Sequence, residues 1–393
     1  YNSQQREIKR LEDYIAKNKV RASTAQMAKS REKKLEKMEK IEKPSFTSKP
    51  HFRFNCIQST AQVILEVNGL EVGYYYPLLP KMKFDVQNEE KLVITGFNGI
   101  GKSTLLKALE LGVYDHIKGD GREFVITDPT AMKIRAEDGR SITNTDISMF
   151  INNLPNRKDT VSFDTEDASG STSQAANVVE AMETGSSLFL IDEDTSATNF
   201  MIRDELMQRV VLRDQEPITP FIERIRELYE RYDISSIIVA GSCGSYFHPA
   251  DHIIQMDQYV PKDITTAAKD AAKDFPMVSL PKKKHPDPCF DRCFKAGNHL
   301  KKERKIKMKT LGKDAFSINK DTVDLRYVEQ ITDTEQTTAL GYALLYAKLH
   351  LMDGKKDLRT VADELMQIIE TKGLSALLDS KYVKSNLAMP RKQ

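Results

Sequence analysis

The sequence has no tryptophan, few cysteines for its length and no long apolar run. No run approaches the roughly 18 apolar residues of a membrane-spanning helix, and the first residues show no charged-then-apolar signal pattern, so a membrane-embedded role is not expected. Four cysteines in 393 residues are too few for a disulfide scaffold, which favours a reducing, cytoplasmic location. The length predicts two or three domains, and the composition, 40% apolar and 30% charged, is typical of a globular protein.

Charge is unevenly distributed, although the formal net charge is only +2. Residues 1–53 hold 15 Lys or Arg against 7 Asp or Glu, and residues 281–309 hold 11 against 3. Each of these segments therefore carries a net charge of +8, and the rest of the chain carries −14. Two basic segments beside an acidic body suggest a polyanionic partner.

Residues 4–43 are predicted to form one long polar helix, because they contain no glycine or proline and have a thin apolar stripe. Such a helix has too little apolar surface to fold alone, so it is expected to pack against a partner helix or to lie on a negatively charged surface. Pro44 and Pro50 place a linker after it. We expect a basic helical arm and linker over residues 1–54.

The next part of the chain alternates short apolar runs with helical patterns, which indicates an α/β fold with a mostly parallel sheet. The predicted strands are residues 63–67, 82–86, 91–95, 123–127, 188–191 and 234–240. The predicted helices begin near residue 102 and cover residues 173–183, 201–213 and 219–232. We expect this domain over residues 55–275.

A basic linker is expected over residues 276–310 and a small, mostly helical C-terminal domain over residues 311–393. One helix is predicted to open with a Thr332-x-x-Glu335 capping box. A second is predicted from about Leu358 to a stop at Gly373.

Two features of the expected linker leave alternatives open. His285, Cys289, Cys293 and His299 have a spacing that permits a zinc site, but neighbouring lysines oppose a cation, so free thiols are expected. The lysine run at residues 301–309 alternates basic with apolar residues, as an edge strand does, and would line a phosphate backbone or face solvent.

The strongest local signal is Gly96-Phe97-Asn98-Gly99-Ile100-Gly101-Lys102-Ser103, which fits the P-loop pattern G-x-x-x-x-G-K-[ST]. Glycines bring backbone N–H groups close to phosphates, and the following helix N-terminus favours negative charge. Lys102 is expected to reach the β- and γ-phosphates, and the Ser103 hydroxyl to ligate Mg²⁺. The predicted nucleotide contacts in this loop are Gly96, Asn98, Gly99, Gly101, Lys102, Ser103 and Thr104.

A second motif, Leu188-Phe189-Leu190-Ile191-Asp192-Glu193, ends an apolar strand with two acids. Asp192 is expected to hold Mg²⁺, and Glu193 to polarise the attacking water as a general base. Glu193 and Lys102 are therefore the predicted catalytic residues, and a solvated pair of acids at a strand end is the alternative.

A small-residue loop, residues 169–174, opens a helix 18 residues before Asp192. A loop of this kind is often a simple turn, but at a helix N-terminus it binds phosphate. It would let a second subunit close over the nucleotide. The predicted contacts are Ser169, Gly170, Ser171 and Gln174.

In this order the motifs resemble those of the ATP-binding cassette (ABC) superfamily, with residues 169–174 in place of the LSGGQ signature and residues 195–199 in place of the D-loop. Residues 101–393 resemble the predicted ATPases of the ABC class. Residues 1–105 resemble the interdomain linker and the start of the second cassette of ABC-F translation factors. The two resemblances meet at the P-loop, so the chain is interpreted as a chimera joined there.

The resemblance also identifies departures. Tyr74 is placed to stack on adenine, with Tyr75 and Tyr76 as alternatives, but residues 103–173 contain no glutamine for a Q-loop. The switch histidine is replaced by Gly241-Ser242-Cys243, and His248 and His252 are candidate substitutes. These departures weaken the expectation of fast hydrolysis and leave the expectation of binding intact.

The resemblance implies a soluble P-loop ABC-type nucleotide-binding domain, with a long N-terminal helix and a small helical C-terminal domain. It implies ATP and Mg²⁺ as cofactors, ATP hydrolysis at a head-to-tail homodimer interface and, from the basic segments and the ABC-F linker, an RNA or ribosome partner. Two alternatives are the ATP-binding subunit of a transporter and a nucleotide-gated RNA-binding module with negligible turnover.

Overall fold

The computed structural model describes residues 63–72, 79–88, 90–97, 99, 101–114, 124–154, 156–203, 210, 216–275, 287–295, 306–378 and 386–391. All of these belong to the second of two compact units, His51–Gln393. The predicted helix at 4–43, most of the predicted helix at 201–213, and the side chains of Tyr74, Asn98, His285 and His299 lie outside the described residues.

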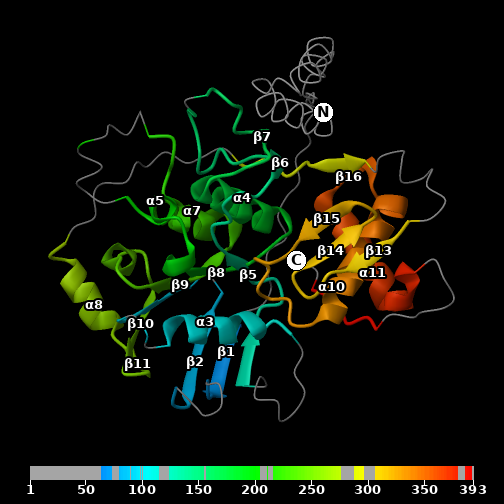
Figure 1. Ribbon diagram of the computed structural model, residues 1–393. Helices are drawn as coiled ribbons and strands as arrows, with labels where there is room; N and C mark the ends of the chain where they lie inside the picture. The colour runs from blue at the N-terminus through cyan, green and yellow to red at the C-terminus, as the bar shows by residue number, and fades with distance from the viewer. Residues whose placement is uncertain are drawn as a thin grey trace, which may run out of the picture. The chain divides into compact units, whose positions relative to one another are not determined.

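A six-stranded, mostly parallel sheet forms the centre of the described part of residues 63–275, as the α/β prediction requires (Figure 1). This part of the chain is called the cassette below. Its order is β11 (Val260–Asp263), β10 (His252–Asp257), β3 (Lys91–Thr95), β9 (Ser235–Ala240), β8 (Leu188–Asp192) and β5 (Met132–Ile134). Strands β10, β3, β9, β8 and β5 are parallel, and only β11 is antiparallel to its neighbour. The carboxyl ends of the parallel strands therefore meet at one edge of the sheet.

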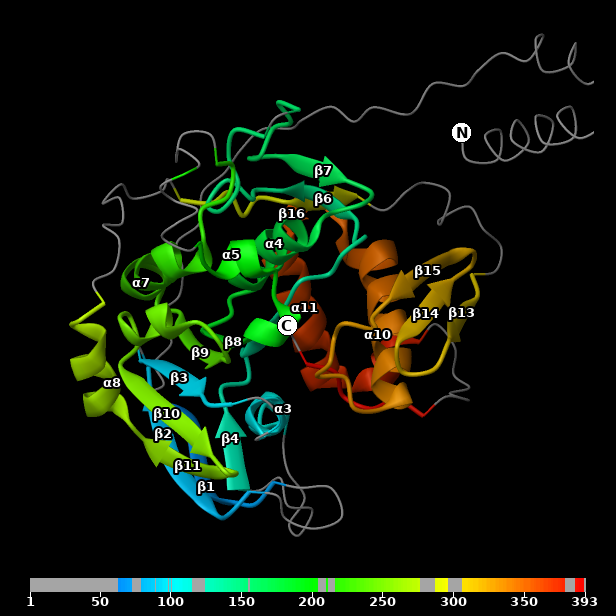
Figure 2. The ribbon, with the colours of Figure 1, turned by 60° about the vertical axis from the view of Figure 1, so that its left-hand side comes forward.

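Apolar cores cover both faces of this sheet, which explains why its central strands are continuous apolar runs. Phe189 and Ile191 of β8 join the core under α4 (Gly170–Glu183) and α7 (Phe221–Tyr232). Leu188 and Leu190, which alternate with them, join the core under α3 (Lys102–Leu111). Figure 2 shows α4 and α7 on one side of the sheet and α3 on the other. The two-residue period of the strand thus divides one apolar run between two cores.

Smaller elements complete the cassette. An antiparallel sheet in the order β2, β1, β4 packs its buried side chains into the core that contains α3. The bounds of these and the remaining cassette elements are β1 (Val63–Leu70), β2 (Met82–Gln87), β4 (Val125–Thr127), β6 (Ile142–Thr145), β7 (Phe163–Thr165), η2 (Glu193–Thr195), α5 (Thr198–Met201), η4 (Gly244–Phe247) and α8 (Thr265–Ala272).

The C-terminal region contains the two predicted helices and a sheet that the sequence analysis did not predict. The helices are α10 (Thr334–Tyr346) and α11 (Leu358–Lys372), the latter ending before Gly373 as predicted. The sheet is β13 (Met308–Thr310), β14 (Ala315–Ile318) and β15 (Asp321–Asp324), and the other elements are η5 (Ala347–Leu351), β16 (Asp353–Asp357) and η6 (Leu374–Leu377). Strands of three or four residues are too short to show a two-residue period.

The predicted capping box of α10 is wrong by one residue. Asp333 is the N-cap, and its box partner is Gln336 instead of Glu335. The Gln336 side chain accepts hydrogen bonds from the N–H groups of Asp333 (3.3 Å) and Thr332 (2.8 Å). Both Thr and Asp are good N-caps, so the sequence alone did not distinguish the two registers.

Two strands lie within residues 276–310, the stretch expected to be a linker. β12 (Cys293–Lys295) pairs antiparallel with β16, and β13 is an edge strand of the C-terminal sheet. No helix in the described part of the chain is long and apolar enough to cross a membrane.

Candidate nucleotide-binding site

The P-loop connects β3 to α3 at the carboxyl edge of the sheet. Gly101 is the N-cap of α3 with φ +86°, a left-handed conformation that glycine adopts without strain. A Cβ at this position would lie 3.0 Å from Leu79 Cδ2 and 3.4 Å from Tyr259 Cδ1, which is too close for most side chains. Both the backbone conformation and the packing therefore require glycine here.

Lys102 is buried, with 5% of its surface exposed, and its side chain bends back over the loop. The Nζ group donates hydrogen bonds to the carbonyl oxygens of Gly96 (2.8 Å) and Phe97 (2.9 Å). Ser103 is exposed and Thr104 half-buried in the first turn of α3, which contains no acidic residue. The loop and helix N-terminus thus present an ammonium group and a hydroxyl, with no carboxylate in that turn to repel phosphate.

Asp192 ends β8 and is almost fully buried, with 3% of its surface exposed. Its Oδ1 atom accepts a hydrogen bond from the N–H of Asp194 (3.2 Å). In the sheet register, Asp192 lies beside Val239 of β9, which lies beside Ile94 of β3. Since two strand spacings separate β8 from β3, Asp192 is about 10 Å from the strand that leads into the P-loop.

Glu193 begins η2 directly after Asp192 and is held by the loop that follows β9. Its carboxylate accepts hydrogen bonds from the N–H groups of Gly241 (2.7 Å) and Ser242 (3.1 Å) and from the Ser242 hydroxyl. Burial by itself raises the pKa of Glu193, but the hydrogen bonds from Ser242, Gly241 and Cys243 outweigh burial and leave the pKa below its ordinary value. Glu193 is therefore an ionised acceptor at neutral pH.

Neither candidate substitute for the switch histidine takes that place among the described residues. His252 lies at the amino end of β10 beside Leu92, and its Nε2 is 3.1 Å from Glu90 Oε1. His248 follows η4, where its carbonyl oxygen accepts a hydrogen bond from Lys269 Nζ (2.8 Å). Gly241 and Ser242 occupy the position instead. From the sequence, these two residues were noted only because they stand where a histidine was expected.

The loop at residues 169–174 divides into an exposed end and a buried end. Ser169 is exposed as the N-cap of α4, and its Oγ lies 3.0 Å from Thr172 Oγ1. At Gly170, a Cβ would lie 3.1 Å from Asp138 Oδ1, so the backbone of Gly170 packs closely against the side chain of Asp138. The first turn of α4 contains no acidic residue, and the carboxylate beside it is that of Asp138.

Ser171 and Gln174 face inward. Gln174 is fully buried, and its amide donates to Ser196 Oγ (2.9 Å) and accepts from the N–H of Ala197 (2.8 Å). Ser171 donates to Asn199 Oδ1 (2.6 Å). Both side chains thus attach α4 to residues 195–199, the segment that follows Glu193.

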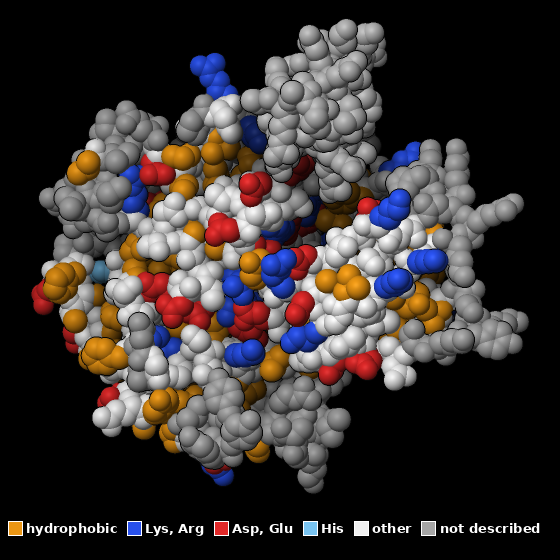
Figure 3. Space-filling view, viewed as in Figure 1, with side chains coloured by type: hydrophobic (Ala, Val, Ile, Leu, Met, Phe, Trp, Pro, Cys, Tyr) orange, Lys and Arg blue, Asp and Glu red, His pale blue; other side chains and the backbone are white. Residues whose placement is uncertain are grey.

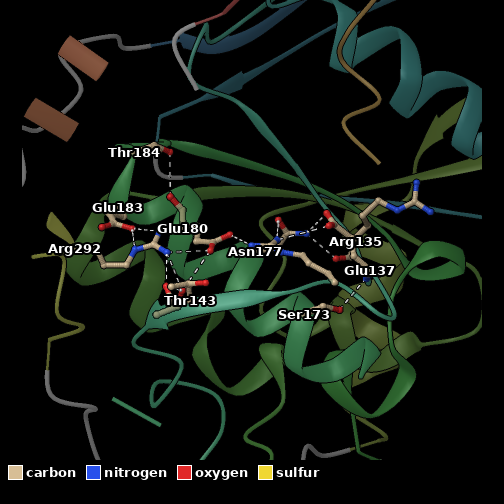
Figure 4. A network of polar contacts seen from close by, with 11 residues as sticks. Arg135, Glu137, Thr143, Ser173, Asn177, Glu180, Glu183, Thr184 and Arg292 are labelled. Atoms are coloured by element: carbon tan, nitrogen blue, oxygen red, sulfur yellow. Dashed lines mark hydrogen bonds and ion pairs between the residues drawn. The ribbon is translucent and has the colours of Figure 1, made fainter. Parts of the chain in front are cut away.

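A polar network supports α4 along its length (Figure 4). At its middle, Asn177 Nδ2 donates to the Arg135 carbonyl (3.0 Å) and to Glu137 Oε1 (2.9 Å), so the segment after β5 is tied to the helix. At its carboxyl end, Arg292 Nε donates to Glu183 Oε2 (2.8 Å) and Nη1 approaches Glu180 Oε1 (3.3 Å). The sequence analysis did not identify this network, because its members are far apart in the chain.

The C-terminal region contacts the cassette through polar groups beside β5. Arg135 pairs with Glu329 and lies over the Tyr327 ring, 4.7 Å from its centroid. Gln330 Nε2 donates to the carbonyl oxygens of Glu110 and Ala131, each at 3.2 Å. Figure 3 shows basic and acidic side chains interleaved on this face.

Three family models match the chain. The ABC_ATPase model, described as a P-loop domain, matches residues 88–287, just over half of the chain. An ABC transporter model matches residues 1–54, and a model of the MRB1590 C-terminal domain matches residues 307–393. The chain therefore belongs to the ABC_ATPase family of P-loop domains, the class that its sheet and P-loop also define.

Similar curated proteins share only part of their length with this chain. YfmM of Bacillus subtilis, an uncharacterized ABC transporter ATP-binding protein, is 40% identical over 119 residues, covering 30% of this chain and 23% of YfmM. MJ1628 of Methanocaldococcus jannaschii, an uncharacterized protein, is 35% identical over 158 residues, covering 40% of this chain and 34% of MJ1628. Protein GCN20 of Saccharomyces cerevisiae is 33% identical over 111 residues, covering 28% and 15%. The chain thus spans about a third or less of these relatives.

Solved structures with a similar arrangement include CbiO1 from Clostridium perfringens, part of the ABC transporter complex CbiONQ. It is 16% identical with a TM-score of 0.39, and the match covers 55% of this chain and 93% of CbiO1. The ADP conformation of MJ1267, an ATP-binding cassette of an ABC transporter, is 15% identical with a TM-score of 0.37, covering 54% of this chain and 95% of MJ1267.

Proposed function

We propose that the chain binds MgATP on the P-loop and hydrolyses it, with Lys102 and Glu193 as the catalytic residues. The observation that supports this most directly is the position of Lys102, Asp192 and Glu193 at the carboxyl edge of one parallel sheet. In open α/β sheets this edge is the ligand-binding edge. The family of the P-loop domain agrees with it.

The phosphates would lie on the N–H groups of residues 96–103, with Gly96, Asn98, Gly99, Gly101 and Thr104 as the remaining contacts. Lys102 would exchange its bonds to the Gly96 and Phe97 carbonyls for β- and γ-phosphate oxygens.

Ser103 and Asp192 offer a hydroxyl and a carboxylate, the oxygen donors that suit Mg²⁺ when phosphate and water complete its shell. The bound ion would neutralise charge on the phosphates.

Glu193 would accept the proton of the attacking water. The water oxygen bonds to the γ-phosphorus, and the bond from that phosphorus to the β–γ bridging oxygen breaks, which leaves ADP and phosphate. Ser242 and Gly241 would keep the carboxylate ionised and oriented for this step.

A second copy of the chain would complete the site in a head-to-tail dimer. The exposed Ser169 and the amino end of α4, which has no acid in its first turn, would face the phosphates bound by the partner. Gln174 and Ser171 would act indirectly, by keeping α4 attached to the segment after Glu193.

The test measures MgATP affinity and phosphate release for the wild type, Lys102→Ala and Lys107→Ala. Lys107 is an exposed lysine on the same helix and serves as the matched control. Lys102→Ala is expected to weaken binding by about 10- to 100-fold, the range for a lost hydrogen bond to a charged group, and to reduce phosphate release to background. Wild-type affinity in Lys102→Ala would refute the P-loop assignment.

A second candidate function is coupling of the ATPase to RNA or the ribosome, which the charge of residues 1–53 and 281–309 favours. RNA affinity measured at two salt concentrations, with and without MgATP, tests it. A steep loss of affinity with salt is expected, because phosphate contacts release counterions, and a flat response would refute it. Phosphate release that stays at background with and without RNA would favour a nucleotide-gated binding module instead.

The low cysteine count also supports a reducing, cytoplasmic compartment as part of the proposal. A transporter subunit is the remaining alternative, since some relatives carry that name. Stable co-purification with a membrane permease would favour it over the soluble ATPase.

A further inference from the structure

The hairpin between β10 and β11 lies beside the P-loop. β10 runs parallel to β3, with Gln255 paired to Thr95, so both strands end at the nucleotide edge. The turn follows at Gln258 and Tyr259. The Tyr259 ring lies 3.4 Å from where a Cβ of Gly101 would be, and Leu79 lies 3.0 Å from the same point. Tyr259 and Leu79 therefore both pack against Gly101, the last glycine of the P-loop.

The conformation of this turn is unfavourable for its residues. Gln258 has φ +47° and Tyr259 has φ +67°, and a two-residue hairpin with both values positive has the form of a type I′ turn, which Asn-Gly makes with least strain. A positive φ is an outlier for a bulky residue, and such outliers concentrate at ligand sites. An aromatic residue thus occupies a backbone position that glycine would adopt with less strain.

The ring is also accessible. Tyr259 is 38% exposed, whereas Leu79 behind it is 1% exposed. A partly exposed aromatic ring beside the P-loop has the chemistry of a base-stacking group, because every nucleobase has a π-face.

We propose that Tyr259 stacks on the base of the bound nucleotide and is a determinant of affinity for nucleoside triphosphates over triphosphate alone. This rests on the proposed function, since the phosphates must lie on residues 96–103. The phenol ring supplies the contact, so a phenyl ring at the same position is expected to replace it. Tyr74, the stacking residue expected from the sequence, is the alternative for the same role.

The experiment compares dissociation constants for MgATP and for inorganic tripolyphosphate, which has no base. Tyr259→Ala is expected to lose about 5- to 150-fold in MgATP affinity, the range for one aromatic–base stack, with tripolyphosphate affinity unchanged. Tyr259→Phe is expected to bind both ligands as the wild type does. Phe275→Ala, at an aromatic residue that is 75% exposed, is the control and is expected to change neither constant.

Tyr259→Gly separates stacking from folding of the turn. Glycine relieves the positive φ, so this variant is expected to unfold at a temperature no lower than the wild type while binding MgATP as weakly as Tyr259→Ala. Wild-type MgATP affinity in Tyr259→Ala or Tyr259→Gly, or a loss confined to Tyr74→Ala, overturns the stacking role. An equal loss for MgATP and tripolyphosphate also overturns it, because the turn would then only shape the loop.

Failure of the proposed function gives a different result. Wild-type protein that binds neither MgATP nor tripolyphosphate overturns the P-loop function and the stacking role with it. Wild-type protein that binds both ligands, with no effect of Tyr259→Ala on either, overturns the stacking role alone.

Discussion

The sheet edge that carries the P-loop and the attachment of the C-terminal region differ in what positions their residues. Lys102, Asp192 and Glu193 follow strands whose apolar side chains are buried on both faces of the sheet. Burial of many apolar side chains, at roughly 25 cal/mol per Å², stabilises these strands, so their position does not depend on any single surface charge. The edge is therefore expected to keep its geometry when its own polar side chains are changed.

The C-terminal region, and the segment 287–295 that pairs with it through β12 and β16, contact the cassette through a few polar side chains. Arg292 inserts between Glu183 and Glu180, and Arg391 Nη2 donates to the Ala131 carbonyl (2.6 Å). Burial lowers the pKa of Arg391 to about 10. Burial also acts to lower the pKa of Arg292, but Glu183 and Glu180 outweigh it and leave that pKa above its ordinary value. An intact buried pair adds little stability, yet a broken one costs much, so this attachment depends on individual residues.

The largest expected effect is on chemistry at the edge. Glu193→Gln is expected to reduce phosphate release by about 100-fold or more, the contribution of a general base, while MgATP affinity and unfolding temperature stay near the wild-type values. Asp194→Asn, at the exposed neighbouring acid, is the control and should release phosphate normally. Equal turnover in Glu193→Gln and wild type would remove Glu193 from the mechanism.

Arg292→Ala tests the attachment. The change leaves Glu183 buried without its guanidinium, so the free energy of unfolding is expected to fall by about 3–5 kcal/mol, measured by chemical denaturation. Burial raises the pKa of Glu183, and in the variant nothing at Arg292 opposes the rise. When the pKa of a carboxyl group is higher in the folded than in the unfolded protein, its contribution to stability is present below the pKa of the unfolded state and is lost as pH rises through the pKa of the folded state. The loss of stability in Arg292→Ala should therefore be smaller at pH 5 than at pH 8.

A defect of Arg292→Ala that is under about 1 kcal/mol at both pH values would show that the attachment does not depend on this pair. Arg326→Ala, at an exposed pair with Asp324, is the matched control and should change stability little.

Ser242→Ala is expected to have a smaller effect that depends on pH. The hydroxyl stabilises the ionised form of Glu193, so its removal raises the pKa of Glu193 towards the ordinary value. Phosphate release that needs the ionised carboxylate should then fall at a higher pH than in the wild type, with a deficit below about pH 5 and near-normal rates at pH 8. Ser242→Thr keeps the hydroxyl and should restore the wild-type profile. Superimposable pH profiles for Ser242→Ala and wild type would exclude the role.

The smallest effect is expected for Glu329→Gln. Its pair with Arg135 is partly exposed, with side chains 26% and 18% accessible, so the loss should be about 1 kcal/mol or less by chemical denaturation. If Glu329→Gln instead destabilises the protein as much as Arg292→Ala does, the Arg135–Glu329 pair contributes as much to stability as the Arg292–Glu183 pair. Asp324→Asn is the control, because its pair with Arg326 is more exposed.

The parts of the site that the sequence predicted are those whose signal is local. The P-loop pattern, the apolar run before Asp192 and the two-residue alternation of the strands all arise within a few residues, and the sheet and helices follow them. Gln174 has a local pattern too, but its amide turned inward to Ser196 and Ala197, since burial and partners depend on what packs against α4.

The residues that the sequence did not single out act across long separations. Ser242 contacts Glu193 from 49 positions away, and Arg292 contacts Glu183 from 109. Tyr259 lies against Gly101 only because β10 and β3 are neighbours in the sheet. No periodicity links such pairs, so local patterns cannot predict them.

By itself the sequence predicted the order of strands and helices around the P-loop and offered Lys102, Asp192 and Glu193 as candidate site residues, because local patterning and residue type decide both. Only the tertiary structure decided which donors hold Glu193, which side chain lies over Gly101, and how Arg292 ties residues 287–295 to α4. The reason is that hydrogen bonding, burial and close packing depend on neighbours in space, and the sheet brings those neighbours together from distant parts of the chain.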